Sequence, residues 1–190
     1  MSRGEATRAE LVRVARERFA ERGYAAVGTE EIVRAARVTR GALYHHFTDK
    51  RDLFRAVHEQ LEAGLVESIA ARIGSIEDPL ELIATGLRLF LDDCTEPAFM
   101  RIALTDAPGV LGWEQWREID ARYGMGLVVA ALQNAMDAGA LRRQPVRPLA
   151  HLVLGALGEA AFMIANSADP EQARREVEPP LMGLLDGMRA

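Results

Sequence analysis

Apolar residues recur at helical spacing along most of the 190-residue chain, and this periodicity limits the fold more than any other feature. In the first such stretch, Leu11, Val14 and Phe19 share one face of a helix that runs from Glu5 to Arg22 and that Gly23 is expected to end. Similar stretches follow toward the C-terminus, and none shows the period-two alternation of a half-buried strand. The pattern predicts an all-α fold with about nine helices.

Aspartate–proline pairs mark the starts of two later helices, because aspartate caps a helix and proline fits its first position. These pairs are Asp78-Pro79 and Asp169-Pro170. Pro97 and Pro148 are expected to open two more helices in the same way, and Gly112 precedes a helix that begins near Trp113 and ends near Gly139.

The last helix contains two adjacent prolines, Pro179 and Pro180. Each proline removes a backbone donor and crowds the preceding turn. The sequence therefore predicts a break or a sharp kink at this position.

Charge is distributed unevenly along the chain. Residues 1–51 hold 11 lysines and arginines and seven acidic residues, which gives a net charge of +4. Residues 52–190 hold 12 lysines and arginines and 21 acidic residues, which gives a net charge of −9. A basic head on an acidic body is typical of a DNA-binding domain joined to a domain that does not bind DNA.

The sequence also favours a soluble, cytoplasmic protein. Cys94 is the only cysteine, so no internal disulfide can form. Residues 1–20 are rich in Arg and Glu, unlike a signal peptide. The nearly apolar stretch Leu152–Ala165 is short for a membrane span and carries Glu159.

Two short helices joined by a tight turn are expected over about residues 28–47. Thr29 is the expected N-cap of the first, and Thr39 of the second, which ends at His46. A long fourth helix is expected from Asp49. This arrangement is a helix-turn-helix, and it divides the chain into a DNA-binding domain of residues 1–52 and a helical domain of residues 53–190.

The second helix of such a motif enters the major groove with its first residues facing base edges. Here Arg40 can pair with guanine, and Gly41 and Ala42 allow close approach to the DNA. Leu43 and Phe47 are expected to pack beneath the helix. Tyr44, His45 and His46 then face the DNA, with Lys50 placed for a phosphate.

The segment Thr29–Lys50, TEEIVRAARVTRGALYHHFTDK, resembles the signature of the tetracycline-repressor-like (TetR/AcrR) family of transcriptional regulators, and the match extends from about Ala6 to Ala63. By this resemblance, phosphate contacts fall to Thr29, Thr39, Tyr44, His46 and Lys50. Base-facing positions fall to Arg40, Gly41, Ala42 and His45. The chain departs from the family pattern at Arg37, where glycine is usual. If this residue has a positive φ, arginine destabilises the turn by roughly 1 kcal/mol relative to glycine. The arginine side chain can also add a phosphate contact.

The resemblance implies that the body binds an unknown small-molecule effector and forms a homodimer through its last two helical segments, residues 148–166 and 170–188. Aromatic and methionine side chains are the candidate lining of a largely apolar pocket, although such residues are often simply core. They are Phe90, Phe99, Met100, Trp113, Trp116, Tyr123, Met125, Phe162 and Met163, of which Trp113 and Trp116 are singled out because they share one side of their helix. Candidate polar groups are Arg101, Asp120, His151, Glu159 and Asn166, and the sequence does not select among them.

The preferred hypothesis is a ligand-responsive repressor that binds an inverted-repeat operator on double-stranded DNA as a dimer. The alternatives are a small helical ligand carrier or enzyme, and a nucleoid-type protein that prefers no inverted repeat. No catalytic cluster, cofactor motif or metal pattern is evident, and the adjacent His45 and His46 diverge on a helix. DNA binding that weakens steeply with salt would distinguish the repressor from an enzyme or a ligand carrier.

Overall fold

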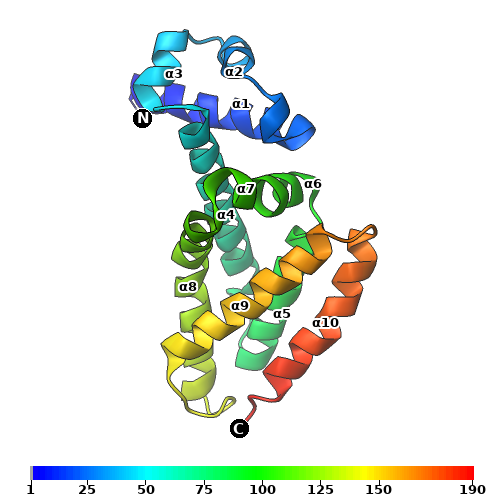
Figure 1. Ribbon diagram of the computed structural model, residues 1–190. Helices are drawn as coiled ribbons and strands as arrows, with labels where there is room; N and C mark the ends of the chain where they lie inside the picture. The colour runs from blue at the N-terminus through cyan, green and yellow to red at the C-terminus, as the bar shows by residue number, and fades with distance from the viewer. Residues whose placement is uncertain (1) are drawn as a thin grey trace. The chain divides into compact units, whose positions relative to one another are not determined.

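The computed structural model describes residues 2–190 and is built of helices (Figure 1). Since α6, η1 and α7 follow one another directly, the described residues form nine helical stretches, as predicted. The elements are α1 (Arg3–Ala26), α2 (Thr29–Ala35), α3 (Arg40–His46), α4 (Lys50–Ile73), α5 (Pro79–Asp93), α6 (Pro97–Phe99), the π-helix η1 (Met100–Asp106), α7 (Ala107–Leu111), α8 (Trp113–Asp137), α9 (Val146–Ala165) and α10 (Pro170–Asp186).

The chain packs as two compact units. Unit 1 comprises the chain up to Leu61 together with Pro97–Trp116, and unit 2 comprises Glu62–Glu96 and Arg117–Ala190. Helices α4 and α8 each run from one unit into the other. This division differs from the predicted boundary at residue 52, because unit 1 extends along α4 as far as Leu61 and also includes residues 97–116.

Specific polar contacts attach the segment 97–116 to the rest of unit 1. The backbone N–H of Tyr24 donates to Asp106 (2.7 Å), and the Arg51 guanidinium donates to the carbonyl oxygens of Val110 and Leu111 (2.9 and 2.8 Å). Gly23 has a φ of 77° and interrupts α1, and a Cβ there would lie 2.8 Å from Nη2 of Arg101. Glycine therefore serves both the turn and the close approach of Arg101.

The core of unit 1 is formed by the predicted apolar faces. Leu11, Phe19 and Leu43 are fully buried. The ring of Phe19 packs edge-on against that of Phe54, with centroids 5.3 Å apart. This ring contact joins α1 to α4, while α3 packs against α1 and α2 with Leu43 buried and its opposite face exposed to solvent.

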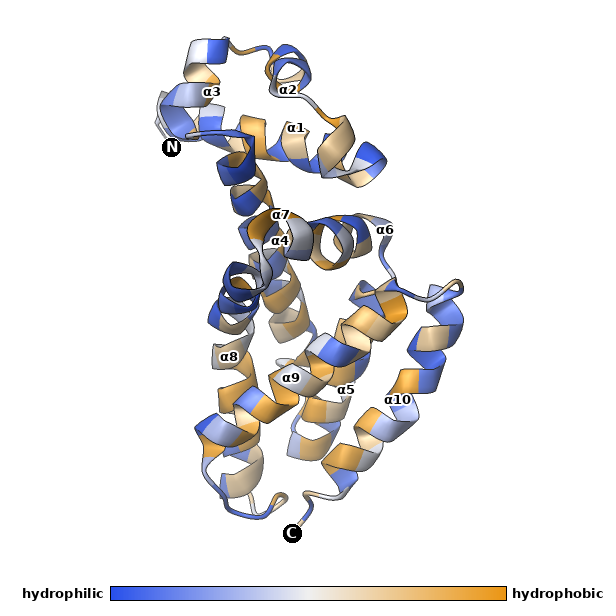
Figure 2. Cartoon of the chain, in the orientation of Figure 1, coloured by the Kyte–Doolittle hydropathy of each residue, from blue (hydrophilic) through white to orange (hydrophobic). Residues whose placement is uncertain are grey.

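In unit 2, α9 and α10 pack against each other and both pack against α5. Orange, apolar residues predominate along α9 and recur along α5, with blue and pale residues between them (Figure 2). Asp78 caps α5 by accepting from the backbone N–H groups of Leu80 and Glu81 (2.8 and 2.9 Å), and Asp169 caps α10 in the predicted manner.

Three local predictions were wrong. The N-cap of α2 is Gly28 rather than Thr29, which is the first residue of the helix. Helix α9 begins at Val146, before Pro148. Helix α10 is continuous through Pro179 and Pro180, because both prolines are exposed and the carbonyl groups that they leave unbonded belong to the exposed residues Arg175 and Glu176.

By length and composition α9 is apolar enough to cross a membrane. Six of its residues are buried, including Leu149, Leu157 and Ile164. A core helix of a soluble protein passes the same test, so this feature is weak evidence for a membrane span.

Candidate DNA interface and ligand cavity

Helix α3 has one buried face and one exposed face. Leu43 and Phe47 are buried, at 0% and 2% exposure, whereas Tyr44 is 43% exposed and Arg40 and His45 are exposed. Thr39 caps the helix, accepting from the backbone N–H of Ala42 at 3.1 Å. Three of the side chains that sequence analysis assigned to DNA, those of Arg40, Tyr44 and His45, therefore lie on the exposed side of α3, while the apolar pair anchors the helix.

Arg40 is held loosely at the start of α3. Its Nη1 lies 3.5 Å from Oε1 of Glu30, and its guanidinium lies 5.5 Å from the ring centroid of Tyr44. Both members of the ion pair are mostly exposed, so the pair is worth little in free energy. The guanidinium can therefore leave Glu30 at a small cost in free energy.

Lys50 lies at the first residue of α4 and its ammonium is 4.0 Å from the ring centroid of Tyr24. Partial burial lowers the pKa of Lys50, and the negative charge of Asp106 opposes this effect. Tyr24 was not among the predicted site residues. Its aromatic face lies against the ammonium group and limits the conformations of the lysine side chain.

The arginines of α1 are mostly engaged within unit 1. Arg13 pairs with Glu10 and Glu17, Arg18 with Glu21, and Arg22 with Glu31. These contacts explain why the first helix contributes less free positive charge than its composition suggests.

Arg37, in the turn between α2 and α3, has a φ of 54° and is the only non-glycine residue at positive φ among residues 2–190. Its side chain is exposed. The backbone strain anticipated at this departure from the family pattern is present, and the charge remains available to solvent or a phosphate.

His45 and His46 have ring centroids 5.1 Å apart in an edge-on arrangement. Across residues 2–190 there is no group of three or more His, Cys, Asp and Glu side chains that could hold a metal ion.

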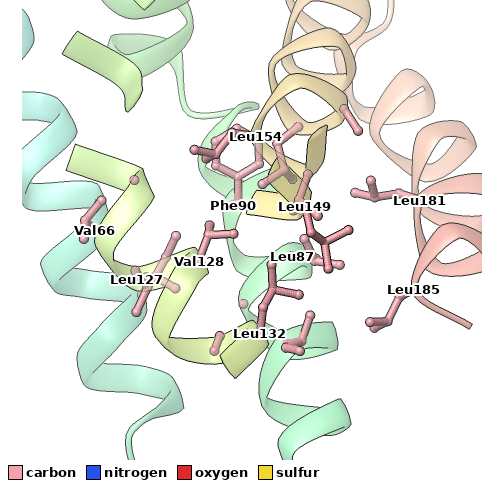
Figure 3. A pocket seen from close by; sticks show the side chains of 18 of the residues that line it. Val66, Leu87, Phe90, Leu127, Val128, Leu132, Leu149, Leu154, Leu181 and Leu185 are labelled. Carbon is pink, nitrogen blue, oxygen red and sulfur yellow. The ribbon is translucent and has the colours of Figure 1, made fainter. Parts of the chain in front are cut away.

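Unit 2 contains a cavity of about 280 Å³ (Figure 3). Side chains from α4, α5, α8, α9 and α10 converge on it, among them Val66, Phe90, Val128, Leu154 and Leu181. Glycine at position 124 allows α9 to approach, because a Cβ there would lie 3.1 Å from Cδ2 of Leu154. Glu62 and Asp120 bring the only polar side chains to this lining.

Burial dominates the chemistry of these two carboxyl groups. Burial and then the charge of Asp120 raise the pKa of Glu62 to about 8. Burial raises the pKa of Asp120 to about 6, and the positive charge of Arg117 opposes this. Cys94 is buried, and burial together with the charges of Glu62, Asp93 and Asp120 raises the pKa of its thiol.

The predicted pocket residues are divided among several places. Phe90 and Asp120 line the cavity. Glu159 and Met163 line a separate groove between α9 and α10. The remaining candidates, which are Phe99, Met100, Arg101, Trp113, Trp116, Tyr123, Met125, His151, Phe162 and Asn166, are in neither lining.

Trp113 and Trp116 show that residue type alone does not predict which side chains line the cavity. Their rings lie close together, with centroids 5.1 Å apart, but both belong to unit 1. Trp116 is buried and its indole N–H donates to the carbonyl oxygen of Ala103 at 2.9 Å, so it holds η1 and α8 together. Leucine and valine line the cavity instead.

Glu62 was missed by sequence analysis, although a signal was present. It lies at helical spacing from Val66, Ile69 and Ile73 on the otherwise apolar side of α4 that faces the cavity. An acidic residue in register with a buried stripe is unusual and indicates a special environment.

The groove between α9 and α10 exposes large apolar side chains. Met163 is 56% exposed and Leu184 is 61% exposed, and the small residues Ala156 and Ala160 form part of the floor. Exposed apolar side chains gathered in one place are typical of an interaction surface.

An exposed short helix with an arginine and small residues at its start, placed after a tight turn and anchored by a buried apolar face, defines a helix-turn-helix DNA-binding protein. Comparison with known proteins agrees. The family model described as bacterial regulatory proteins, tetR family, matches residues 11–57, and the model described as tetracyclin repressor-like, C-terminal domain, matches residues 80–188. The chain belongs to the TetR family of transcriptional regulators.

Solved and curated relatives cover most of the chain. A TetR-family regulator of Pectobacterium atrosepticum is 35% identical, superposes with a TM-score of 0.91, and covers 100% of this chain and 98% of its own. The Transposon Tn10 TetC protein of Escherichia coli is 27% identical over 76% of this chain and 73% of its own. The transcriptional repressor AcnR of Corynebacterium efficiens is 33% identical over 55% of this chain and 60% of its own.

These findings make the chain a DNA-binding transcriptional regulator, and they confirm the predicted fold class and family. Proteins of this family are regulators rather than enzymes, act as dimers and respond to small molecules.

Proposed function

We propose that the protein is a cytoplasmic, ligand-responsive repressor that binds an inverted-repeat operator as a homodimer. The observation that carries this proposal is the exposed face of α3, where Arg40, Tyr44 and His45 are free of the core while Leu43 fixes the helix. The repressor AcnR among the relatives supports the sign of regulation.

Contacts to DNA are assigned as follows. Arg40, Gly41, Ala42 and His45 read base edges, and phosphate contacts come from Thr29, Arg37, Thr39, Tyr44, His46 and Lys50. The ring of Tyr24 holds Lys50, and the cap at Thr39 orients the first turn of α3. Positioning contacts and base-reading contacts are thus supplied by different side chains.

Homodimerisation is assigned to α9 and α10. The exposed Met163 and Leu184 beside the small Ala156 and Ala160 favour a four-helix bundle formed by two copies. Such a dimer would hold its two α3 helices about 34–36 Å apart, or a multiple of that spacing, to match successive major grooves.

The cavity of unit 2 is the proposed effector site. It is enclosed mainly by apolar side chains, and α4, which contributes to its wall, continues into unit 1. An effector that prefers one position of α4 would change operator affinity by a coupling free energy of typically about 1–3 kcal/mol.

The test begins with selection of binding sites from random duplexes, followed by titration of the selected operator. Arg40→Ala should weaken operator binding by about 1–3 kcal/mol and relax the preference at one base pair in each half-site. Lys50→Ala should weaken binding to all sequences alike and reduce the salt dependence.

Arg175→Ala, an exposed change on α10, is the control and should bind as the unmodified protein does. Wild-type affinity in Arg40→Ala would remove that residue from base recognition. A protein that selects no inverted repeat would instead be a nucleoid-type binder. A reporter gene behind the selected operator then reports repression or activation.

A further inference from the structure

Lys50 is the only lysine of the 190-residue chain, and its ammonium group rests on an aromatic ring. The ammonium lies 4.0 Å from the centroid of the Tyr24 ring. That ring packs edge-on against Phe54 of α4, with centroids 5.0 Å apart. The position of the Tyr24 ring therefore influences where the positive charge of Lys50 is held.

Tyr24 is held in turn by a residue of the segment 97–116. Its backbone N–H donates to Oδ2 of Asp106, the last residue of η1, at 2.7 Å. Gly23, with a φ of 77°, interrupts α1 immediately before Tyr24, so regular helical geometry does not set the orientation of Tyr24 relative to α1. A hydrogen bond to a carboxylate is stronger than one between neutral groups. Asp106 is thus the side chain that fixes Tyr24 after the interruption.

The same segment also fixes the residue that follows Lys50. The guanidinium of Arg51 donates to the carbonyl oxygens of Val110 and Leu111 (2.9 and 2.8 Å). All these residues belong to unit 1. The chain next to Lys50 and the ring beneath its ammonium group are therefore both attached to residues 106–111.

Resting on the proposed role of Lys50 as a phosphate contact, we propose that Asp106 is a positioning residue of the DNA-binding surface, which acts on Lys50 through Tyr24. The carboxylate holds the backbone of Tyr24, and the ring of Tyr24 holds the ammonium group. A lysine side chain loses much rotamer freedom when it binds. Ordering it beforehand reduces that loss when it contacts a phosphate.

The charge of Asp106 by itself has the opposite effect. A negative charge near a surface that binds DNA weakens the binding, so its removal alone should strengthen it. Asp106→Asn and Asp106→Ala both remove the charge, but only asparagine keeps a side-chain oxygen that can accept from the N–H of Tyr24. Comparison of these two variants separates the hydrogen bond from the charge.

The first experiment titrates the selected operator with both variants. Asp106→Ala should bind at least threefold more weakly than Asp106→Asn and should show a smaller salt dependence. In the Lys50→Ala background the two substitutions should give equal affinities, because the side chain that Asp106 positions is absent. Glu114→Ala, an exposed change in the same unit, is the control and should bind as the parent protein does.

The second experiment observes Lys50 directly, without DNA. Reductive methylation with formaldehyde labelled with carbon-13 marks Lys50 and the N-terminal amine, and dimethylation keeps the positive charge. Methyl protons above an aromatic face resonate upfield, so the Lys50 signal of the parent protein should be shifted upfield. Asp106→Ala and Tyr24→Leu should reduce this shift, whereas Asp106→Asn and Tyr24→Phe should retain it. The N-terminal signal is the internal reference.

Circular dichroism verifies that each variant is folded. If Asp106→Ala has lost helix content, Asp106→Leu replaces it, because leucine is similar to asparagine in shape and cannot accept a hydrogen bond.

Three results would each overturn the proposal. They are equal operator affinities of the asparagine and alanine variants, a difference that persists in the Lys50→Ala background, and a Lys50 signal that Asp106→Ala leaves unchanged. A different result would count against the proposed function alone. If Asp106→Ala moves the Lys50 signal but Lys50→Ala binds the operator as the parent protein does, Asp106 positions the lysine and the phosphate contact of Lys50 fails.

Discussion

Arg37 shows how a single residue can carry a conformational cost beside a functional surface. Its φ of 54° lies in the left-handed region, where a side chain is disfavoured by roughly 1 kcal/mol relative to glycine. The exposed guanidinium adds positive charge close to α3.

Arg37→Gly should therefore raise the free energy of unfolding by up to about 1 kcal/mol, as measured by urea denaturation. Arg37→Ala is the matched control, because it removes the same charge and keeps the strain. Both variants should lose operator affinity equally if Arg37 contacts a phosphate. A glycine variant no more stable than the alanine variant would contradict the assignment of strain.

Glu62 makes the stability of the protein depend on pH. Its pKa is raised from 4.5 to about 8, so the folded protein retains a proton that the unfolded chain releases over this interval. This contribution to stability is fully present below pH 4.5 and is lost as the pH rises through about 8. Of the charged groups, Asp120 acts on Glu62, and Glu62 in turn helps to raise the pKa of the Cys94 thiol. His58, one helical turn earlier, is buried, and burial lowers its pKa to about 4.

Glu62→Gln cannot ionise and should be more stable than the unmodified protein by an amount that grows from pH 5 to pH 8.5. The gain should reach about 2–5 kcal/mol at the upper end. Denaturation at both pH values measures it, with Glu67→Gln expected to show no comparable trend. A stability difference that is constant with pH would show that Glu62 titrates near its ordinary value.

At the scale of the helices, periodicity and caps were sufficient to predict most elements. The caps at Thr39, Asp78 and Asp169 were all predicted correctly, because each is a local interaction between a side chain and the next turn. The buried and exposed faces of α3 also followed from spacing alone. Local physics therefore accounts for the candidate DNA interface.

The cavity was less accessible to sequence analysis, since its wall is assembled from five helices that are distant in the chain. Among its predicted residues only Phe90 and Asp120 line it, and the leucines that do most of the lining are indistinguishable in sequence from core leucines. Residues 97–116 likewise join unit 1 through contacts such as Tyr24 to Asp106, which no periodicity reveals.

The prolines of α10 allow a test of why the predicted break is absent. Pro179 occupies the helix interior on an exposed side, and it denies a backbone donor to the carbonyl group of Arg175. Pro179→Ala should restore that hydrogen bond and raise the free energy of unfolding by about 1–3 kcal/mol. Pro170→Ala makes the same change at the first position of α10, where proline is tolerated, and should alter stability by less than about 0.5 kcal/mol. Equal effects of the two variants, measured at the same protein concentration, would contradict this explanation.

At the scale of the whole molecule, recognition of an inverted repeat requires two copies of α3, and one chain supplies only one. The proposed dimer surface includes Met163 on α9 and Leu184 on α10, both more than half exposed in the single chain. An association of two such grooves is isologous, so each changed residue acts twice in the interface.

Met163→Glu should convert the dimer to a monomer, because burying an unpaired carboxylate in an apolar interface costs several kcal/mol. Sedimentation analysis should show the loss of dimer, and circular dichroism should show an unchanged helix content, since Met163 is exposed in each subunit. Operator affinity should fall by at least tenfold, whereas the weak affinity for unrelated duplex should persist, because each α3 remains intact. Arg175→Glu, on α10 but outside the groove, is the control and should remain dimeric. If the Met163→Glu protein is dimeric and its operator affinity is unchanged, the dimer interface does not lie on α9 and α10. The apolar groove would then bind a different partner.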